Sequence, residues 1–479
     1  MISPKIHRLK TPLLILSFIF THFLYAQTSI EFEEPVKQRV FVLTDITNEP
    51  DDQQSLVRFL SYANEYDIEG LVATTSTHLR NQTRKEKIEE LVNSYAMVYP
   101  NLAKHAHDYP DPEDLKDKIK EHLPLYSMDG VGKGKDSPGS DLLIKAVDKA
   151  DDRPLWVSVW GGANCLAQAL WKIKETRTAE EVNKFVSKLK VYAISDQDFA
   201  GPWIRNNFPE IFYVVDPSAG DSHLEYYKAT WTGISGDRFY KNGPQHHFDL
   251  VDNPWLNQNI IQNHGPLGKH YLESTYIMEG DTPSFIGLIN NGLAWYVSPS
   301  YGGWGGRYEF YRSYAEKGKI WTSSVRTQDE ILLPNGHQEA SNQATIWRWR
   351  EAYQNDFAAR MDWQVNEDYK KANHHPIVVL NSEEGKSLAK GTVAAEKEVI
   401  LSAKGTHDPD GDKFSYRWFV YKEAGNLTGD VPFDHSTEED LQFTMPNLPD
   451  GQELHIILEV KDMGIPSLFT YRRVVLTNP

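Results

Sequence analysis

The stretch from residue 39 to residue 60, RVFVLTDITNEPDDQQSLVRFL, limits most strongly what this chain can fold into. Val40 to Leu43 form a short apolar run that is typical of a buried strand. The apolar residues between Leu56 and Leu60 supply one side of an amphipathic helix. The turn between strand and helix carries four carboxylates, those of Asp45, Glu49, Asp51 and Asp52. In an open α/β sheet, ligands bind at such a turn, at the carboxyl end of a strand.

This acidic turn has two interpretations. Carboxylates that are crowded on one turn repel one another, and a hard cation with oxygen ligands, above all Ca²⁺, relieves that repulsion. Alternatively, the turn is an acidic helix N-terminus in which Asp51 and Asp52 cap free N–H groups and complement the helix dipole. A cap needs one carboxylate and the turn has four, so the cation site is favoured.

The next βα unit places a histidine near this turn. Ile68 to Thr75 read as a second strand, which ends in the polar loop Ser76-Thr77-His78. A strand, a helix and a strand at this spacing form a βαβ unit, so the strands are parallel and their carboxyl ends share one edge. We therefore consider His78 a candidate for substrate binding, although a loop histidine is more often merely solvated.

Polar residues follow two later strands in the same way. The strand 155–159 leads into Trp160-Gly161-Gly162-Ala163-Asn164 and a helix, and the strand 189–194 leads into Ser195-Asp196-Gln197-Asp198. This alternation of strands and helices predicts an α/β fold with a mostly parallel sheet. The substrate-binding candidates at these strand ends are Asn164, Asp196, Gln197, Asp198 and Trp203.

Two further motifs lie later in the chain. Asp281 stands before Thr-Pro and an apolar helical run, a setting that fits either an N-cap or a contribution to an acidic site. Trp304 lies in the glycine-rich loop YGGWGGRY. A tryptophan flanked by glycines is either an exposed platform on which a sugar stacks or a buried side chain that pins a tight loop, and we include Trp304 among the substrate-binding candidates.

The pattern changes near residue 374, after which short alternating strands dominate. We expect an all-β, immunoglobulin-like sandwich over residues 374–479, after an α/β domain over residues 36–365. The motif DPDGD at residues 408–412 resembles the turn of polycystic-kidney-disease-type domains. Its aspartates fit a calcium site, but a glycine-containing turn explains them more simply.

The ends and the composition predict an exported protein. Residues 1–26 have a basic start, an apolar core and a cleavage site, as in a signal peptide, so we expect a secreted or periplasmic protein. Later residues offer no run of about 20 apolar residues, so we expect no membrane span. Cys165 is the only cysteine, which excludes a disulfide framework. The net charge of −17 argues against a nucleic-acid partner. The oligomeric state stays open.

The acidic turn resembles the N-terminal signature of nucleoside hydrolases, an aspartate at a strand end followed closely by an Asp-Asp pair. The runs TDITNEPDDQQSLVRFL and GLVATTSTHLR resemble more closely a secreted bacterial family, described as cellulose-binding proteins with a nucleoside-hydrolase-like domain and a C-terminal immunoglobulin-like domain. The resemblance covers nearly the whole mature chain. It implies a nucleoside-hydrolase-like fold and a carbohydrate partner.

The resemblance also implies a bound Ca²⁺ and a set of residue roles. The Ca²⁺ ligands would be the side chains of Asp45, Asp52 and Asp281 and the backbone carbonyl of Ala163. Asp45 would also take the proton of the attacking water. Asp51 and Asn164 would bind the hydroxyl groups of the sugar.

The chain departs from nucleoside hydrolases at two places. Asp45 and Asp51 are separated by two more residues than in that family, and Glu49 lies within this insertion, which makes it a second catalytic candidate. Gly280 stands where many of those enzymes have a histidine that protonates the leaving base. The usual general acid for departure of a nucleobase is therefore missing.

Three functions compete on this evidence. The first is a Ca²⁺-assisted hydrolase of glycosidic bonds in glycans or other glycosides, favoured by export, by the second domain and by Gly280. The second is a non-catalytic carbohydrate-binding protein, favoured by the description of the resembled family. The third is a true nucleoside N-ribohydrolase, favoured by the aspartate set. An experiment that distinguishes them asks whether the purified protein with Ca²⁺ cleaves nucleosides, cleaves glycans, or only binds them.

Overall fold

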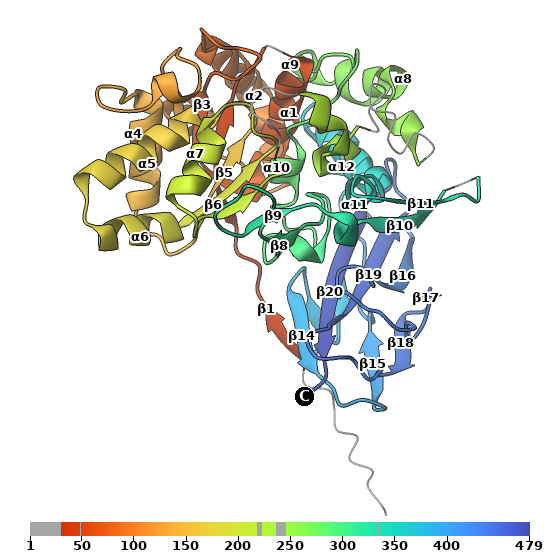
Figure 1. Cartoon of the computed structure of the whole chain (residues 1–479). Helices are drawn as coiled ribbons and strands as arrows, with labels where there is room; N and C mark the ends of the chain where they lie inside the picture. The colour runs from red at the N-terminus through yellow and green to blue at the C-terminus, as the bar shows by residue number, and fades with distance from the viewer. Residues whose placement is uncertain (1–29, 48, 218–222, 236–245, 334) are drawn as a thin grey trace, which may run out of the picture.

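The computed structural model describes residues 30–47, 49–217, 223–235, 246–333 and 335–479 (Figure 1). The predicted signal peptide, residues 1–26, lies outside the described residues, and export stays a prediction. Among the helices of the described ranges, none is long and apolar enough to cross a membrane.

The large domain is built on an eight-stranded sheet with the strand order β4-β3-β2-β5-β6-β7-β9-β8. Every neighbouring pair is parallel except β8 and β9 at one edge. The predicted α/β fold with a mostly parallel sheet is confirmed. The strands are β2 (Gln38–Thr44), β3 (Tyr66–Ala73), β4 (Ile119–Glu121), β5 (Leu155–Val159), β6 (Leu189–Ala193), β7 (Phe212–Val214), β8 (Glu309–Tyr311) and β9 (Ile320–Thr322).

Helices cover both faces of this sheet, as the buried, apolar strands require. Alternate residues of β2 enter different hydrophobic clusters: Val40 and Val42 pack with α1, α2, α10 and α12, whereas Phe41 and Leu43 pack with α4, α5, α6 and α7. The helices are α1 (Pro50–Ser61), α2 (Lys85–His105), α3 (Pro112–Asp117), α4 (Pro138–Asp148), α5 (Asn164–Thr176), α6 (Ala179–Ser187), α7 (Ala200–Asn207), α8 (Asn253–Leu256), α9 (Gly265–Gly268), α10 (Pro283–Ile286), α11 (Ala344–Trp347) and α12 (Arg350–Trp363).

The C-terminal region is all-β, as predicted. Its main sheet has the order β1-β14-β20-β19-β16-β17, and two two-stranded sheets pair β15 with β18 and β12 with β13. A further two-stranded sheet, β10 with β11, precedes α11 and α12 in the chain. The strands are β1 (Ile30–Glu33), β10 (Asp329–Leu332), β11 (Gln338–Ser341), β12 (Val379–Leu380), β13 (Glu383–Glu384), β14 (Leu388–Thr392), β15 (Glu398–Ser402), β16 (Phe414–Val420), β17 (His435–Ser436), β18 (Asp440–Thr444), β19 (Leu454–Asp462) and β20 (Phe469–Thr477).

Three features tie this region to the large domain. The first is β1, which precedes the large domain in the chain but pairs with β14 of the C-terminal sheet (Figure 1). The second is a set of hydrogen bonds from Arg473, whose Nε and Nη2 donate to the carbonyls of Leu293 and Gly302 at 2.7 and 2.9 Å. Tyr421 and Tyr471 also belong to the same hydrophobic cluster as α1. One hydrophobic cluster therefore extends from the large domain into the C-terminal region, which also has a separate core of its own. The predicted boundaries at residues 36, 365 and 374 stay predictions.

Backbone groups of the DPDGD turn bind one oxygen of Asp408, whereas its Oδ2 has no partner among the described residues. Oδ1 of Asp408 accepts hydrogen bonds from the backbone N–H groups of Asp410 and Asp412, at 2.9 and 3.0 Å. Asp410 accepts from the N–H of His374, at 2.7 Å. These contacts fit the turn interpretation and attach the turn to the segment that joins the two regions.

Candidate functional site

The acidic turn lies between β2 and α1, at the carboxyl edge of the large sheet. Glu49 precedes α1 at the N-cap position, and its side chain makes no cap hydrogen bond. Pro50 is the first residue of α1, a position that needs no N–H donor. Asp51 and Asp52 follow in the first turn, where the helix dipole favours negative charge. The local sequence thus directs both carboxylates toward the sheet edge.

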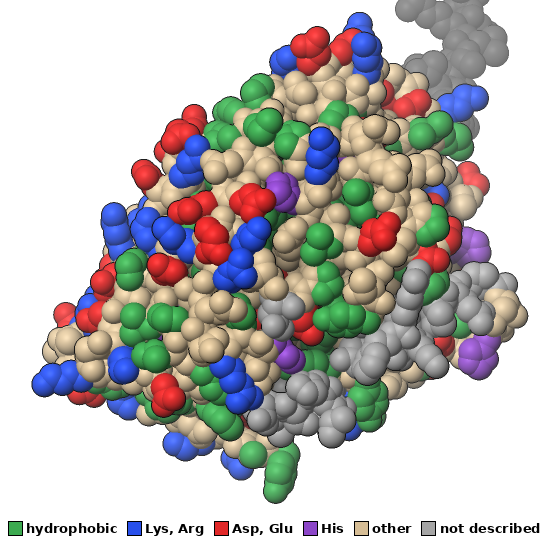
Figure 2. All heavy atoms as spheres, turned by 90° about the horizontal axis from the view of Figure 1, so that it is seen from above, with side chains coloured by type: hydrophobic (Ala, Val, Ile, Leu, Met, Phe, Trp, Pro, Cys, Tyr) green, Lys and Arg blue, Asp and Glu red, His purple; other side chains and the backbone are tan. Residues whose placement is uncertain are grey.

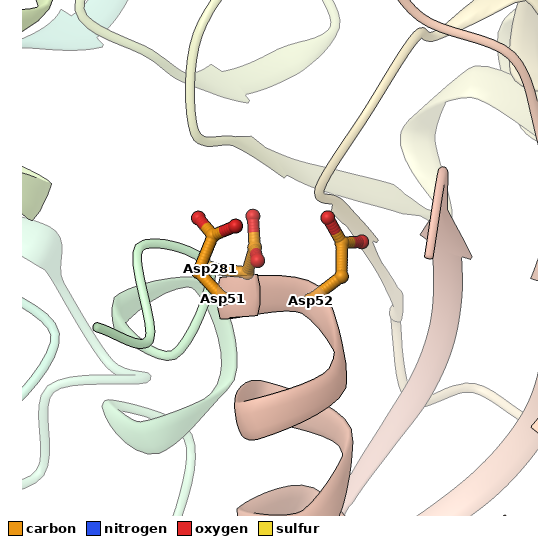
Figure 3. A group of neighbouring side chains, drawn as sticks. All are labelled: Asp51, Asp52 and Asp281. Atoms are coloured by element: carbon orange, nitrogen blue, oxygen red, sulfur yellow. The ribbon is translucent and has the colours of Figure 1, made fainter. Parts of the chain in front are cut away.

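Three carboxylates converge there. Oxygens of Asp51, Asp52 and Asp281 lie within 4.8 Å of one another, and all three side chains are buried. Figure 3 shows that they point the same way, two from the start of α1 and one from the turn before α10. These residues are 230 positions apart in the chain (281 minus 51), and the sequence had already singled out each of them. Asp51, which the sequence assigned to the sugar, is thus placed to be a metal ligand.

Asp45 lies beside this triad. Its Oδ2 accepts a hydrogen bond from the hydroxyl of Ser76, which follows β3. Its Oδ1 is buried and has no hydrogen-bond partner in the described part of the chain. Oδ1 of Asp51 and Oδ2 of Asp281 are likewise buried without a hydrogen-bond partner among the described residues. Three buried carboxylate oxygens without partners near one another are costly, because burial removes the water that would have solvated them.

Burial raises the pKa values of the four aspartates of the centre. Burial raises the pKa of Asp45 above 3.8. Burial, followed by the neighbouring carboxylates, raises the pKa of Asp51, Asp52 and Asp281 well above the same value. The Thr44 hydroxyl, which donates to Asp52, opposes the shift at that residue. The structure therefore favours protons or a cation at this place.

Two glycines give the carboxylates their space. A Cβ atom on Gly161 would lie 2.4 Å from Oδ1 of Asp45. A Cβ atom on Gly280 would lie 2.6 Å from Oδ2 of Asp51 and 2.9 Å from the ring of Trp231. Any side chain at either position would displace an aspartate. The missing histidine at residue 280 thus has a steric reason: the Asp51 carboxylate and the Trp231 ring already fill that space.

Asp281 is held in place by the buried contacts of Glu279, two residues before it. Glu279 has a left-handed backbone, with φ of 52°, and its N–H donates to Oε1 of Gln54 at 3.0 Å. Its carboxylate accepts from Arg58 Nη2 at 3.0 Å, from the Tyr271 hydroxyl at 2.6 Å and from the Thr282 hydroxyl at 2.8 Å. Gln54 and Arg58 belong to α1, so the helix that carries two of the carboxylates also fixes the turn that carries the third.

The GGAN loop after β5 lies against the same centre. The Asn164 amide donates to the hydroxyl of Thr75 and to the carbonyl of Leu125, both at 2.9 Å, and its Oδ1 is left without a partner in the described part of the chain. The Ala163 carbonyl accepts from the N–H of Ala167 at 2.9 Å, as part of α5, and keeps a second lone pair.

The three candidate residues after β6, Asp196, Gln197 and Asp198, differ in the hydrogen bonds that their side chains make. Gln197 donates from Nε2 to the carbonyl of Trp160 at 2.8 Å, and its Oε1 is buried without a partner in the described residues. Asp198 accepts from the N–H of Ala200 at 2.8 Å, and burial raises its pKa to about 7. Asp196 accepts from Arg205 with both oxygens, at 2.8 Å each, within a buried ion pair. Its carboxylate is therefore engaged by α7.

Of the two tryptophans singled out from the sequence, Trp304 lies in the hydrophobic core and Trp203 packs against it. Trp304 is 1% exposed, so the expectation of an exposed sugar platform is wrong. The glycines beside it allow close packing: Gly305 approaches Gly287 and Trp295, and Gly306 has a left-handed φ of 93°. Trp203 is half-buried, packs against the hydrophobic cluster of α5 and α7, and meets the ring of Phe208 edge to face.

Aromatic side chains that the sequence did not single out border the centre. The Tyr226 ring meets that of His78 at 6.3 Å and that of Trp231 at 5.9 Å. The charge of His78 lowers the pKa of Asp45, which places this histidine near the first turn, as expected. The Tyr276 hydroxyl donates to Oε1 of Glu49 at 3.2 Å. Tyr226, Trp231 and Tyr276 lie in segments without clear periodicity, so no pattern in the sequence predicted their position.

The donor set fits a hard divalent cation. Ca²⁺ takes carboxylate and carbonyl oxygens at about 2.3–2.6 Å. Oxygens within 4.8 Å of one another can share one such ion, and three of the oxygens around the centre lack other partners among the described residues. The set contains no sulfur or nitrogen ligand, so the chemistry favours Ca²⁺ or Mg²⁺ over softer metals.

Comparison with known families identifies the chain. Residues 39–308 match the model described as "Cellulose-binding Sde182, nucleoside hydrolase-like domain". Residues 398–478 match the C-terminal domain of the cellulose-binding protein Sde0182. The chain belongs to the Sde182 family. The family match includes the acidic turn, the GGAN loop and Asp281.

A solved structure agrees with this assignment to the Sde182 family. It is a nucleoside hydrolase-related hypothetical protein from Saccharophagus degradans, described as associated with carbohydrate metabolism. It is 35% identical to this chain, with a TM-score of 0.78, and the match covers 93% of this chain and all of the other. The effector protein XOO4466 overlaps 70% of this chain and 95% of its own, with 9% identity and a TM-score of 0.30, which is too low to carry an argument. No curated protein matches.

Proposed function

We propose that this protein is an exported hydrolase of glycosidic bonds, acting on glycans or other glycosides with an aspartate-activated water. The observation that carries the proposal is the group of buried carboxylates formed by Asp45, Asp51, Asp52 and Asp281, three of which have an oxygen without a partner among the described residues. Buried polar atoms are nearly always hydrogen-bonded, so three unpartnered carboxylate oxygens in one place favour a bound ligand or a reacting group there.

Asp45 is the proposed base. Burial raises the pKa of its carboxyl, which makes the carboxylate a stronger proton acceptor. Ser76 holds one oxygen, so the other, Oδ1, is oriented and free to take a proton from water. The water would attack an anomeric carbon, and its proton would pass to Asp45 as the new C–O bond forms. The glycosidic bond would break in the same step, and the leaving group would depart with that bond's electron pair.

The neighbouring groups would serve the transition state. Cleavage at an anomeric carbon develops positive charge on the sugar, which buried carboxylates stabilise strongly in a site that excludes water. The amide oxygen of Asn164 and that of Gln197 are acceptors suited to sugar hydroxyl groups. Ca²⁺, held by Asp51, Asp52, Asp281 and the Ala163 carbonyl with Asp45 beside it, would lower the pKa of a bound water and position it.

A second candidate function is carbohydrate binding without catalysis. Gly280 favours it, because no side chain there can protonate a leaving group and none fits beside Asp51 and Trp231. The description of the family as cellulose-binding points the same way. The same glycine disfavours the third candidate, nucleoside N-ribohydrolysis, because a departing base needs a proton.

The deciding experiment is a hydrolysis screen of the purified mature chain with Ca²⁺ and with a chelator. The substrates are aryl glycosides of the common hexoses and pentoses, cellulose and xylan oligosaccharides, and the nucleosides inosine and uridine. We expect release of an aryl group or a sugar that needs Ca²⁺ and is abolished in Asp45→Ala. Sugar binding with no release from any substrate would establish the non-catalytic function instead.

A further inference from the structure

Two exposed aromatic rings lie in loops around the acidic centre. Phe199 is 56% exposed and directly follows Asp198, whose Oδ2 would lie 2.6 Å from a Cβ atom on Gly162 of the GGAN loop. Tyr276 is 43% exposed and donates its hydroxyl to Glu49, in the turn after β2. Large hydrophobic side chains on a folded surface are common singly, but these two belong to, or contact, loops that carry candidate site residues.

Both rings are carried on backbone that is held by hydrogen bonds. The N–H of Phe199 donates to the hydroxyl of Ser127 at 3.0 Å, and α7 begins at the next residue. The segment that carries Tyr276 is tied to Asn253 through Ser274, by bonds of 2.9 and 3.0 Å in both directions. The rings are thus presented to solvent by fixed loops, which lowers the entropy cost of stacking a ligand on them.

The order of the strands indicates an extended ligand. Phe199 follows β6 and Tyr276 contacts the turn after β2; these two strands are separated by β5 alone, so their carboxyl ends are two strand spacings apart, about 10 Å. A ligand that reaches both loops therefore extends beyond a single sugar ring. Tyr226 and Trp231, 7% and 4% exposed, continue the aromatic lining inward, toward Asp51.

The charge of the centre selects against one class of glycan. Asp45, Glu49 and the triad together carry more carboxylates than one Ca²⁺ neutralises, so a uronic acid unit beside them would be repelled. Figure 2, which shows the molecule from above, has acidic, basic and hydrophobic side chains interspersed over that face, with no broad basic field to attract a polyanion.

We propose that Phe199 and Tyr276 are sugar-stacking platforms that hold a neutral glycan chain across the acidic centre. The choice of a glycan as ligand rests on the proposed function. The assignment replaces Trp304, which is buried, with two rings that solvent and a ligand can reach. The rings contribute through their faces, so the Tyr276 hydroxyl is not needed for stacking.

The test uses isothermal titration calorimetry at saturating Ca²⁺, in an Asp45→Asn background that blocks turnover. The probes are cellohexaose, xylohexaose and laminarihexaose, with hexagalacturonate as the anionic counterpart. The variants are Tyr276→Ala, Tyr276→Phe and Phe199→Leu. The matched control is Tyr314→Ala, because Tyr314 is 98% exposed and lies in the loop before β9, at the opposite edge of the sheet.

We expect at least one neutral hexasaccharide to bind, and Tyr276→Ala and Phe199→Leu each to weaken that binding by about three- to tenfold. Tyr276→Phe and Tyr314→Ala should bind like the parent, and hexagalacturonate should not bind. The proposal is overturned if no neutral hexasaccharide binds, if hexagalacturonate binds as well, or if Tyr276→Ala and Phe199→Leu match the Tyr314 control. Binding is measured without turnover, so failure of the proposed hydrolysis would leave this result readable by itself.

Discussion

Arg58 and Glu279 face one another in the interior with no solvent access to either side chain, and Nη2 of Arg58 lies 3.0 Å from Oε1 of Glu279. The pair connects the helix that carries Asp51 and Asp52 to the turn that carries Asp281. Arg58 also lies 4.0 Å from the centre of the Phe357 ring on α12. A third element therefore supports the same junction, directly behind the acidic centre.

Replacement of Glu279 by glutamine should destabilise the fold. The change leaves the Arg58 guanidinium buried without its counter-charge, and the loss of one partner of a buried pair costs about 3–5 kcal/mol. Urea unfolding followed by circular dichroism measures this. The control is Arg326→Met, which breaks the exposed pair with Glu309 and should cost about 0–1 kcal/mol. Equal effects of the two variants would contradict the structural role of the buried pair.

Calcium should stabilise the wild-type protein by mass action. At a Ca²⁺ concentration about 100 times the dissociation constant, binding to the native state alone adds about 2.7 kcal/mol. Asp52→Asn removes one ligand, so its melting temperature should respond little to Ca²⁺. Without metal the variant should be at least as stable as wild type, because it removes one of the mutually repelling buried carboxylates. Melting scans with Ca²⁺ and with a chelator test both statements. A wild-type melting temperature that changes neither with Ca²⁺ nor with the chelator would contradict the metal site.

The metal-free protein should lose stability as the pH rises. The pKa values of Asp51, Asp52 and Asp281 lie well above 3.8 in the folded state, so the native protein binds more protons than the unfolded chain in that interval. Their contribution is complete below 3.8 and is lost as the pH rises through the folded-state pKa values. In the presence of a chelator, this contribution should lower the melting temperature as the pH rises above about 4. With saturating Ca²⁺, the melting temperature should instead rise over the same pH range, because Ca²⁺ binds the deprotonated carboxylates. Comparison with Asp281→Asn isolates the centre from other groups that titrate.

Gly161→Ala should damage the centre without a change in charge. The new Cβ would lie 2.4 Å from Oδ1 of Asp45, so the carboxylate must move from its bond with Ser76. General-base catalysis typically contributes a factor of about 10² to 10⁴, and a displaced base should lose much of it in kcat. Gly429→Ala is the matched control, because a Cβ there meets no atom within 4 Å. Kinetics with the best aryl glycoside, beside melting curves for both variants, separates displacement of the base from general instability.

The acidic centre was predictable because its residues follow a rule of the fold. Asp45, Asp51 and Asp52 come directly after a buried strand, and parallel strands bring such turns to one edge. Asp281 was predictable by resemblance alone, since 230 residues separate it from Asp51 (281 minus 51) and no periodicity links them.

Burial was harder to predict than position. Trp304 and Trp203 occur beside glycines and polar residues, and the sequence alone could not distinguish exposed rings from packed ones. Tyr276 and Trp231 were missed because their role depends on tertiary contacts with Glu49 and with Gly280. The pairing of β1 with β14 was missed for the same reason, because it joins residues that lie at opposite ends of the chain.

The last prediction concerns the leaving group. Because Gly280 supplies no proton donor and the Trp231 ring blocks one from being added there, nucleoside cleavage should be weak or absent. An aryl glycoside with an activated phenol needs little protonation and should be a much better substrate. General acid catalysis supplies a factor of about 10² to 10⁴, so a difference of that order should separate the aryl glycoside from inosine in kcat/KM.

Three side chains are placed to protonate a leaving group in place of the missing histidine. Asp198 has a pKa of about 7, and Glu49 and His78 both lie near Asp45. Removal of a general acid slows cleavage of a substrate with a poor leaving group more than cleavage of a substrate with a good one. Asp198→Asn, Glu49→Gln and His78→Gln should therefore be compared on a nitrophenyl glycoside and on an alkyl glycoside of the same sugar. If inosine is hydrolysed rapidly and none of these three substitutions slows that reaction, the absence of a histidine at residue 280 does not limit nucleoside cleavage.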